Sequence, residues 1–155
     1  FAELIKSVDN ITLTMANKLK PGGSYVDLHI ETHQMVADIL SQFNIIKVPA
    51  EQALDANLTA TFFPHGLGHH LGLQVHDVGG FMADDRGTHI PAPEAHPFLR
   101  TTRAIESDMV YTIEPGIYIP GIGGFRHSDT VVVTETGNHN MTPWPDSIDE
   151  MTLPV

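Results

Sequence analysis

The sequence contains no cysteine and few basic residues, and both shortages narrow the functions it can have. Of its 155 residues, 8 are Lys or Arg and 19 are Asp or Glu, so the formal net charge is −11 at pH 7. A chain with so few cations is poorly suited to nucleic acid or to an anionic membrane surface, and we expect neither as a partner. Without cysteine, disulfide bonds and thiolate chemistry are excluded, and we expect a cytoplasmic protein.

Long hydrophobic runs are also missing. No apolar stretch is long enough to cross a bilayer, and we expect neither a membrane span nor a signal peptide. Hydrophobic residues make up 41% and charged residues 17% of the chain, which is typical of one folded domain and not of a disordered segment. A helical pattern is already running at Phe1, so we expect the chain to be the C-terminal part of a longer protein.

Residues 1–44 have the pattern of two helices joined by a tight turn. The first helix is expected to end near Lys20, because residues 21–23 (Pro-Gly-Gly) cannot continue it. Ser24 is placed to cap the second helix, with Asp27 completing a start of capping-box type. The expected buried stripes are Ile5, Val8, Ile11, Met15 and Leu19 in the first helix, and Val26, Ile30, His33, Ala37 and Leu40 in the second.

The second part of the chain predicts a sheet. A short helix can follow Pro49, and from Thr61 onward β-branched residues and glycines replace the helical period. Residues 110–119 and 125–135 have strand patterns, residues 136–138 (Thr-Gly-Asn) suit a turn, and residues 79–102 suit a long, ordered surface loop. The tail from Pro143 is expected on the surface. The fold class is therefore α+β: a helix pair (1–44), then a mostly antiparallel sheet with active-site loops (61–142).

A run of histidine and glycine, HGLGHHLG at residues 65–72, is the strongest functional signal. Its glycines disfavour a helix, so His65 and His69 are expected to approach one cavity from a strand and turn. His70 is expected to face the opposite way and to be structural. His76, followed by Asp77 that could orient its ring, suits a proton carrier or a donor to a substrate carbonyl.

Glu114 is a lone acid in an apolar, strand-like run, where an unpaired carboxylate would be costly. Alternation places it on the same face as Thr112 and Gly116. Nitrogen and carboxylate donors from separate segments suit a divalent metal, so we expect His69 and Glu114 to bind one cation. The alternative is a salt bridge from Glu114, for instance to Arg126. The remaining histidines carry no pattern that indicates a site: His29, His33, His89, His96, His127 and His139.

Two blocks of sequence carry a family resemblance: HGLGHHLGLQVHDVGGFMADDRGTH at residues 65–89 and VYTIEPGIY at residues 110–118. They resemble the catalytic domain of Xaa-Pro dipeptidases (prolidases) of the pita-bread metallopeptidase superfamily. The resemblance covers most of the chain and extends to bacterial organophosphorus acid anhydrolases. It implies part of a pita-bread fold with a curved, mostly antiparallel sheet, and hydrolysis of Xaa-Pro dipeptides.

Each site role follows by matching this sequence to the motifs of that family. His69 and Glu114 would bind metal, His65 and His76 would bind substrate and stabilise the tetrahedral intermediate, and Arg126 would meet the substrate carboxylate. The family uses two divalent ions, usually manganese, with cobalt or zinc as alternatives. A bridging hydroxide attacks the scissile carbonyl.

Three departures from the family pattern leave other functions open. The two Asp ligands of the family precede its first helix and have no counterpart here. Ser128 occupies the place of a bridging Glu, and an insertion of bacterial prolidases after residues 116–118 is missing. From Phe125 onward the chain resembles creatinase-like members, some of which work without metal.

We therefore keep two alternatives beside the dipeptidase: a metal-independent C–N hydrolase of creatinase type, and a catalytically inactive binding module. The isolated chain is expected to be inactive or very weakly active. An exposed sheet edge is expected to make it associate with itself or with another chain.

Overall fold

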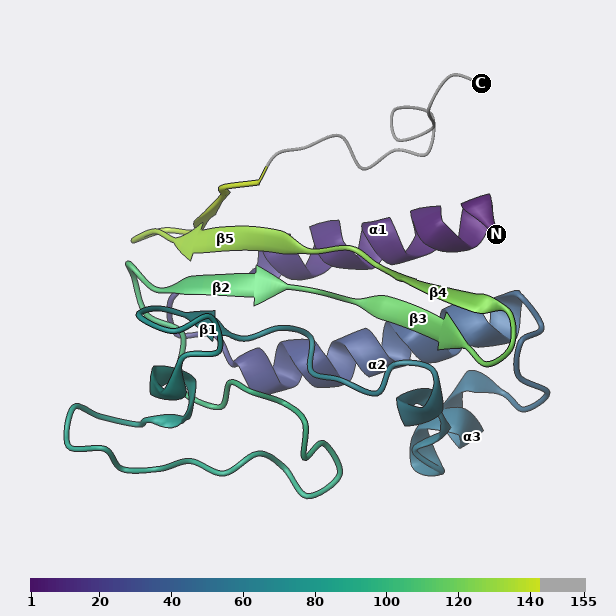
Figure 1. The fold of residues 1–155 in the computed structure, drawn as a ribbon, viewed down its shortest axis with the longest axis horizontal. Helices are drawn as coiled ribbons and strands as arrows, with labels where there is room; N and C mark the ends of the chain where they lie inside the picture. Colours follow the sequence, from purple (N-terminus) through teal and green to yellow (C-terminus); the bar gives the residue numbers. More distant parts are fainter. Residues whose placement is uncertain (143–155) are drawn as a thin grey trace.

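The computed structural model describes residues 1–142, in which two long helices precede the strands (Figure 1). The expectation of a surface tail from Pro143 lies outside the described residues. Helix α1 spans Ala2–Lys18 and helix α2 spans Tyr25–Gln42. The Ser24 hydroxyl accepts a hydrogen bond from the Asp27 N–H at 3.1 Å, which confirms the predicted cap. Among the described residues, no helix is both long and apolar enough to cross a membrane.

The buried face of α2 differs from the predicted stripe. Ile30 is 48% exposed, whereas Leu28, His29 and Thr32 are buried. Two apolar stripes lie side by side on this helix, and the periodicity alone does not decide which one turns inward. The contacts with α1, with α3 (Ala50–Asp55) and with the 3-10 helix η1 (Leu58–Thr61) make that choice. The helix predicted after Pro49 is confirmed.

The strands form two antiparallel sheets. The larger has the order β1-β2-β5-β6, from strands His70–Leu71, Val110–Ile113, Asp129–Val133 and Asn138–Asn140. The smaller pairs β3 (Gly116–Ile119) with β4 (Gly123–Arg126). Each of the two long strands predicted from the sequence is therefore wrong as a continuous element, since each divides between the two sheets.

The two breaks lie opposite each other in one long, interrupted hairpin. Ile113 pairs with Asp129 before the break, and Gly116 pairs with Arg126 after it. Continuing this register through the break places Glu114 opposite Ser128. Pro115 has no N–H with which to continue the ladder, and its carbonyl accepts a hydrogen bond from the His127 N–H at 3.1 Å.

The segment before β1 fills the position beside the interrupted strand. The Glu114 N–H donates to the Leu67 carbonyl, and the Thr112 N–H donates to the His69 carbonyl at 3.0 Å. Residues 67–71 thus lie alongside β2 and extend its pairing to the point where Glu114 stands. This arrangement brings the histidine run at residues 65–72 close to Glu114.

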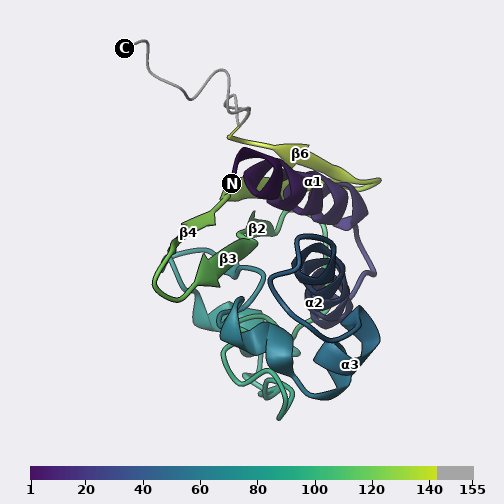
Figure 2. The same ribbon diagram turned by 90° about the vertical axis from the view of Figure 1, so that its right-hand side faces the viewer.

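The helices cover one face of the strands, as Figure 2 shows with α1 and α2 side by side. Tyr25, at the start of α2, stacks on Tyr111 with ring centroids 5.3 Å apart and donates its hydroxyl to the Thr112 carbonyl at 2.6 Å. Both rings are fully buried. The residues between η2 (Val78–Phe81) and β2 form a long loop, as the sequence predicts.

Candidate metal and substrate site

His69 and Glu114 point at each other. The Nε2 atom of His69 lies 3.1 Å from Oε1 of Glu114, and both side chains are largely buried. The two residues come from the segment before β1 and from the break after β2, so only the fold brings them together. The expectation that these two donors converge is confirmed in geometry. An imidazole nitrogen and a carboxylate oxygen at this spacing can share a proton or a divalent cation.

Gly68 allows His69 to reach this position. A Cβ atom at residue 68 would lie 2.1 Å from the Thr112 carbonyl oxygen and 2.5 Å from the Tyr25 hydroxyl. Glycine is therefore required for the close approach of the two backbones. The His69 N–H then donates to the Thr112 hydroxyl at 3.0 Å, which fixes the backbone from which the imidazole projects.

The electrostatics of the pair favour an ion pair between imidazolium and carboxylate. Burial opposes protonation of His69, but its hydrogen bonds to Glu114 and to the His70 carbonyl prevail and raise its pKa above 6.5. Burial also opposes ionisation of Glu114, yet hydrogen bonds from His69 and Thr112 and the charge of Arg126 lower its pKa from 4.5 to about 2. Glu114 is thus ionised at neutral pH, and a cation at this position would replace the proton on His69.

Arg126 contacts the other oxygen of the same carboxylate. Its Nη1 atom lies 3.3 Å from Oε2 of Glu114, and its side chain is 48% exposed. Since Glu114 lies opposite Ser128, Arg126 is the diagonal cross-strand neighbour on the same face. The salt bridge weighed in the sequence analysis is therefore present. The exposed part of the guanidinium remains accessible to an anionic ligand.

His65 is held by two hydrogen bonds that define its tautomer. Its Nδ1 lies 2.8 Å from the Gly66 carbonyl and its Nε2 lies 3.0 Å from the Tyr118 hydroxyl. A carbonyl can only accept, so the neutral ring donates from Nδ1 and accepts the Tyr118 O–H at Nε2. Burial lowers the pKa of His65, which favours this neutral form. Tyr118 was not predicted as a site residue, although Tyr118, Gly116 and Glu114 alternate along one strand pattern.

His76 lies beside His69 but is not oriented by Asp77. The rings of His76 and His69 are 4.5 Å apart at an angle of 82°. The Asp77 carboxylate accepts instead from the N–H groups of Gln74, at 3.2 Å, and Gly79, at 2.8 Å. The predicted orienting role of Asp77 is therefore wrong, because the carboxylate stabilises the turn of its own exposed loop. Residues 73–75, which precede His76, lie in the same loop and not in a strand.

His70 turns away from the site, as predicted. Its ring packs against Tyr111 with centroids 5.3 Å apart, and its Nδ1 lies 3.9 Å from the Asp77 carboxylate. His127 and Asp129 are buried whereas Ser128 is exposed, so these neighbours of Ser128 face the opposite side of the chain.

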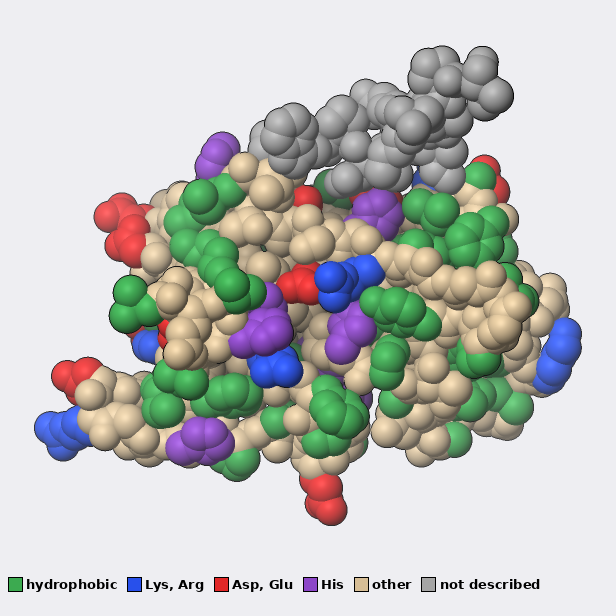
Figure 3. All heavy atoms as spheres, in the orientation of Figure 1, with side chains coloured by type: hydrophobic (Ala, Val, Ile, Leu, Met, Phe, Trp, Pro, Cys, Tyr) green, Lys and Arg blue, Asp and Glu red, His purple; other side chains and the backbone are tan. Residues whose placement is uncertain are grey.

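The side chains of the site gather in the middle of one face of the molecule. Figure 3 shows acidic, basic and histidine side chains together there, between apolar margins. Sequence reasoning missed a second group on the other side of His65: His29, His33 and His96, which cluster closely. The spacing of His29 and His33, one helical turn apart, was a usable signal for two of its three members.

The donor set fits one divalent cation better than two. Within residues 1–142, His69 and Glu114 are the pair of predicted ligands that converge, and Ser128 presents a hydroxyl opposite Glu114 where a bridging carboxylate would be needed. A metal site of hydrolytic type has at least three protein ligands. The two residues present are thus suitable as part of a ligand shell.

Comparison with known proteins identifies the family of the chain. The model of metallopeptidase family M24 matches residues 1–135. An Xaa-Pro dipeptidase of Colwellia psychrerythraea (strain 34H) is 49% identical over 92% of this chain and 38% of its own length. One of Pseudoalteromonas translucida is 47% identical over the same shares. The chain therefore spans less than half of these relatives.

Solved structures show the same fold. Zinc-substituted aminopeptidase P of E. coli in complex with product aligns with a TM-score of 0.74 and 31% identity, over 91% of this chain and 30% of that one. Aminopeptidase PepP of Pseudomonas aeruginosa aligns with a TM-score of 0.76 over 96% of this chain and 33% of that one, at 24% identity, which supports the fold alone. The predicted α+β architecture of a partial pita-bread fold is confirmed.

Proposed function

The chain belongs to metallopeptidase family M24, and from that premise we propose that it provides metal and substrate ligands of an Xaa-Pro dipeptidase. The observation that carries this proposal is the 3.1 Å approach of His69 and Glu114. We propose these two residues as ligands of a divalent metal, with manganese the first choice and cobalt or zinc as alternatives. A second ion, as in the family pattern, would need donors besides these two residues. A cation held there would polarise a scissile carbonyl and lower the pKa of a bound water.

The proposed roles of the other residues follow from their surroundings. Arg126, half exposed beside Glu114, can bind the carboxylate of a dipeptide through its guanidinium. His76 lies on an exposed loop against His69 and can donate a proton or a hydrogen bond to a bound substrate. Both ring nitrogens of His65 are already hydrogen-bonded, Nδ1 to the Gly66 carbonyl and Nε2 to the Tyr118 hydroxyl. His65 therefore has no free N–H to donate, and His76 is the better candidate to stabilise an oxyanion.

Metal binding tests the ligand assignment directly. Titration calorimetry of the 155-residue chain with Mn²⁺ should show binding that Glu114→Gln and His69→Gln each weaken at least about tenfold. Glu135→Gln, an exposed position with the same change of charge, serves as the control. Equal affinity in wild type and both site variants would refute the assignment.

Activity is tested in the complete protein. We expect hydrolysis of Xaa-Pro dipeptides that stops on chelation, and little turnover from the 155-residue chain alone, since a two-donor shell is incomplete. Robust turnover by this chain with manganese would contradict the second expectation.

Ser128 favours a second candidate, metal-independent C–N hydrolysis. Ser128 places a hydroxyl opposite Glu114, where the family pattern has a carboxylate that would bridge two cations. Activity that survives complete chelation would support this candidate over the dipeptidase. Peptide binding without any hydrolysis would support an inactive binding module instead.

We also propose self-association through a sheet edge. Strands β1 and β6 are the outer strands of the four-stranded sheet in the described part of the chain. Unpaired edges favour pairing with another chain. Sedimentation over a range of concentrations should show a dimer or larger species, and a strictly monomeric chain would contradict the proposal.

A further inference from the structure

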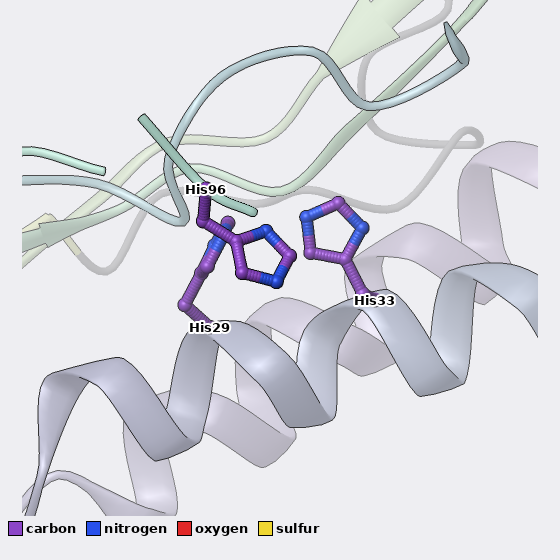
Figure 4. Close-up of side chains that lie close together, drawn as sticks. All are labelled: His29, His33 and His96. Atoms are coloured by element: carbon purple, nitrogen blue, oxygen red, sulfur yellow. The ribbon is translucent and has the colours of Figure 1, made fainter. Parts of the chain in front are cut away.

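Three imidazoles converge beside a cavity that His65 also lines. One ring nitrogen each of His29, His33 and His96 lies within 4.8 Å of the others (Figure 4). His29 and His33 project from successive turns of α2, and His96 comes from the long loop before β2. The ring centroids are 4.6 to 4.8 Å apart.

The cluster is largely buried and borders two cavities. His33 and His96 line one of them together with Asp27, Glu31 and Asp55. His29 and His33 are 2% and 3% exposed, and the rings border a cavity of about 180 Å³. Phe63, Leu99 and His65 also line this cavity of about 180 Å³, and its described lining residues include no Asp or Glu. Burial lowers the pKa values of all three histidines, so the rings are neutral at pH 7 and their lone pairs are not all blocked by protons.

We propose that His29, His33 and His96 form a second metal site, which binds a transition metal such as Zn²⁺, Ni²⁺ or Cu²⁺. Imidazole ligands suit these cations, whereas Mn²⁺ and Mg²⁺ prefer oxygen donors, and the three converging ligand atoms are all nitrogens. Three imidazoles with an open fourth position form a common zinc arrangement, and the adjacent cavity has room for a water molecule. The site is separate from His69 and Glu114 and does not depend on the proposed dipeptidase activity.

The hydrogen bonds of His33 and His29 differ, so the two rings are not equally ready to bind a metal. Nδ1 of His33 lies 2.8 Å from the Thr59 hydroxyl, which can accept its hydrogen and leave Nε2 to bind the metal. Nδ1 of His29 accepts the Leu67 N–H at 3.2 Å, so the hydrogen of this ring resides on Nε2. Ligation through Nε2 of His29 moves that hydrogen to Nδ1, and the Leu67 N–H loses its acceptor.

This change of tautomer in His29 should lower the affinity of the site for zinc. Loss of one buried hydrogen bond should weaken binding about tenfold relative to a site whose three rings already have the right tautomer. Because His96 lies in a loop and the other two rings lie on α2, a bound cation would tie the loop to the helix. Zinc should therefore raise the melting temperature of the chain by a few degrees.

Variants at the histidine cluster and at Glu114 distinguish the two sites. In calorimetry of the 155-residue chain, we expect His33→Gln and His96→Gln each to remove one Zn²⁺ equivalent and the thermal shift, and to leave Mn²⁺ binding unchanged. Glu114→Gln should weaken Mn²⁺ binding and leave in place the Zn²⁺ equivalent that the three histidines bind. His139→Gln, at an exposed position on β6, is the matched control.

His96 is half-buried in a loop, so we expect its variant to disturb folding least. Circular dichroism checks that each variant is folded. X-ray absorption of the Glu114→Gln chain with one Zn²⁺ equivalent provides a readout that requires no change to the three histidines. A first coordination shell with three imidazoles supports the site. A shell with fewer imidazoles, or unchanged zinc stoichiometry and thermal shift in both histidine variants, overturns it.

Discussion

The Nη1 atom of Arg126 lies 3.3 Å from Oε2 of Glu114, on the carboxylate whose Oε1 lies 3.1 Å from His69 Nε2. One carboxylate therefore joins two cationic partners from different strands and segments. The interrupted hairpin explains this, since the register that places Glu114 opposite Ser128 makes Arg126 its diagonal neighbour. A metal ion at Glu114 must compete with the guanidinium as well as with the proton on His69.

This competition predicts opposite effects of Arg126→Gln on two ligands. Removing the guanidinium frees one oxygen of Glu114, so the affinity for Mn²⁺ should rise a few-fold in calorimetry. Binding of an Xaa-Pro dipeptide should weaken by about tenfold or more, because the substrate carboxylate loses a charged partner. Arg86→Gln, on the exposed loop, is the control for net charge. Weaker binding of both ligands would show that Arg126 positions Glu114 for the metal and does not compete with it.

Ser128→Glu should restore the missing carboxylate. The new side chain would share a face with Glu114, and two carboxylates so close repel each other unless a cation lies between them. We expect Mn²⁺ affinity to increase at least about tenfold, with lower stability when the metal is removed. Ser128→Gln has nearly the same size without the charge and should show neither effect. If the Glu and Gln variants bind Mn²⁺ equally, the inferred position opposite Glu114 is incorrect.

Gly68→Ala should disrupt the site through the backbone. The added Cβ would lie 2.1 Å from the Thr112 carbonyl oxygen, so the segment that carries His69 has to shift. We expect a loss of about 3 kcal/mol or more in the free energy of unfolding, measured by urea denaturation, together with loss of Mn²⁺ binding. Gly137→Ala meets no atom within 4 Å and should change stability by less than about 1 kcal/mol. Similar stability for the two variants would contradict this prediction.

The buried histidines of α2 predict sensitivity to acid. Burial, assisted by neighbouring imidazoles, lowers the pKa of His29 from 6.5 to about 2 and that of His33 to about 4. The unfolded chain takes up these protons below about pH 6.5, while the folded chain resists until the lower values are reached. The free energy of unfolding should therefore fall as the pH decreases from 6.5 towards 4, by at most about 1.4 kcal/mol per pH unit for each ring.

Urea denaturation at several pH values, with chelator present, measures this slope. His33→Gln should show a shallower decline than wild type over the same range, whatever its stability at pH 7. His139→Gln, an exposed position, should keep the wild-type slope. Parallel slopes for all three proteins would exclude a contribution from the buried ring.

Local features were predictable where near neighbours determine them. The proline and glycine turn after α1, the Ser24 cap and the short helix after Pro49 follow from backbone chemistry within a few residues. The common face of Thr112 and Glu114 follows from strand alternation, and the resemblance to a family identified His69 and Glu114. Other local patterns misled: Asp77 stabilises its own turn, and Ile30 lies outside the core.

The sequence by itself determined the kinds of donor in this protein and the segments that carry them, because residue chemistry and short-range periodicity are properties of neighbours in the chain. Tertiary structure alone decided that Arg126 meets Glu114, that Tyr118 sets the tautomer of His65, and that His96 joins two histidines of α2. Such contacts depend on strand register and on the packing of segments that are distant in sequence. No local sequence pattern predicts these contacts.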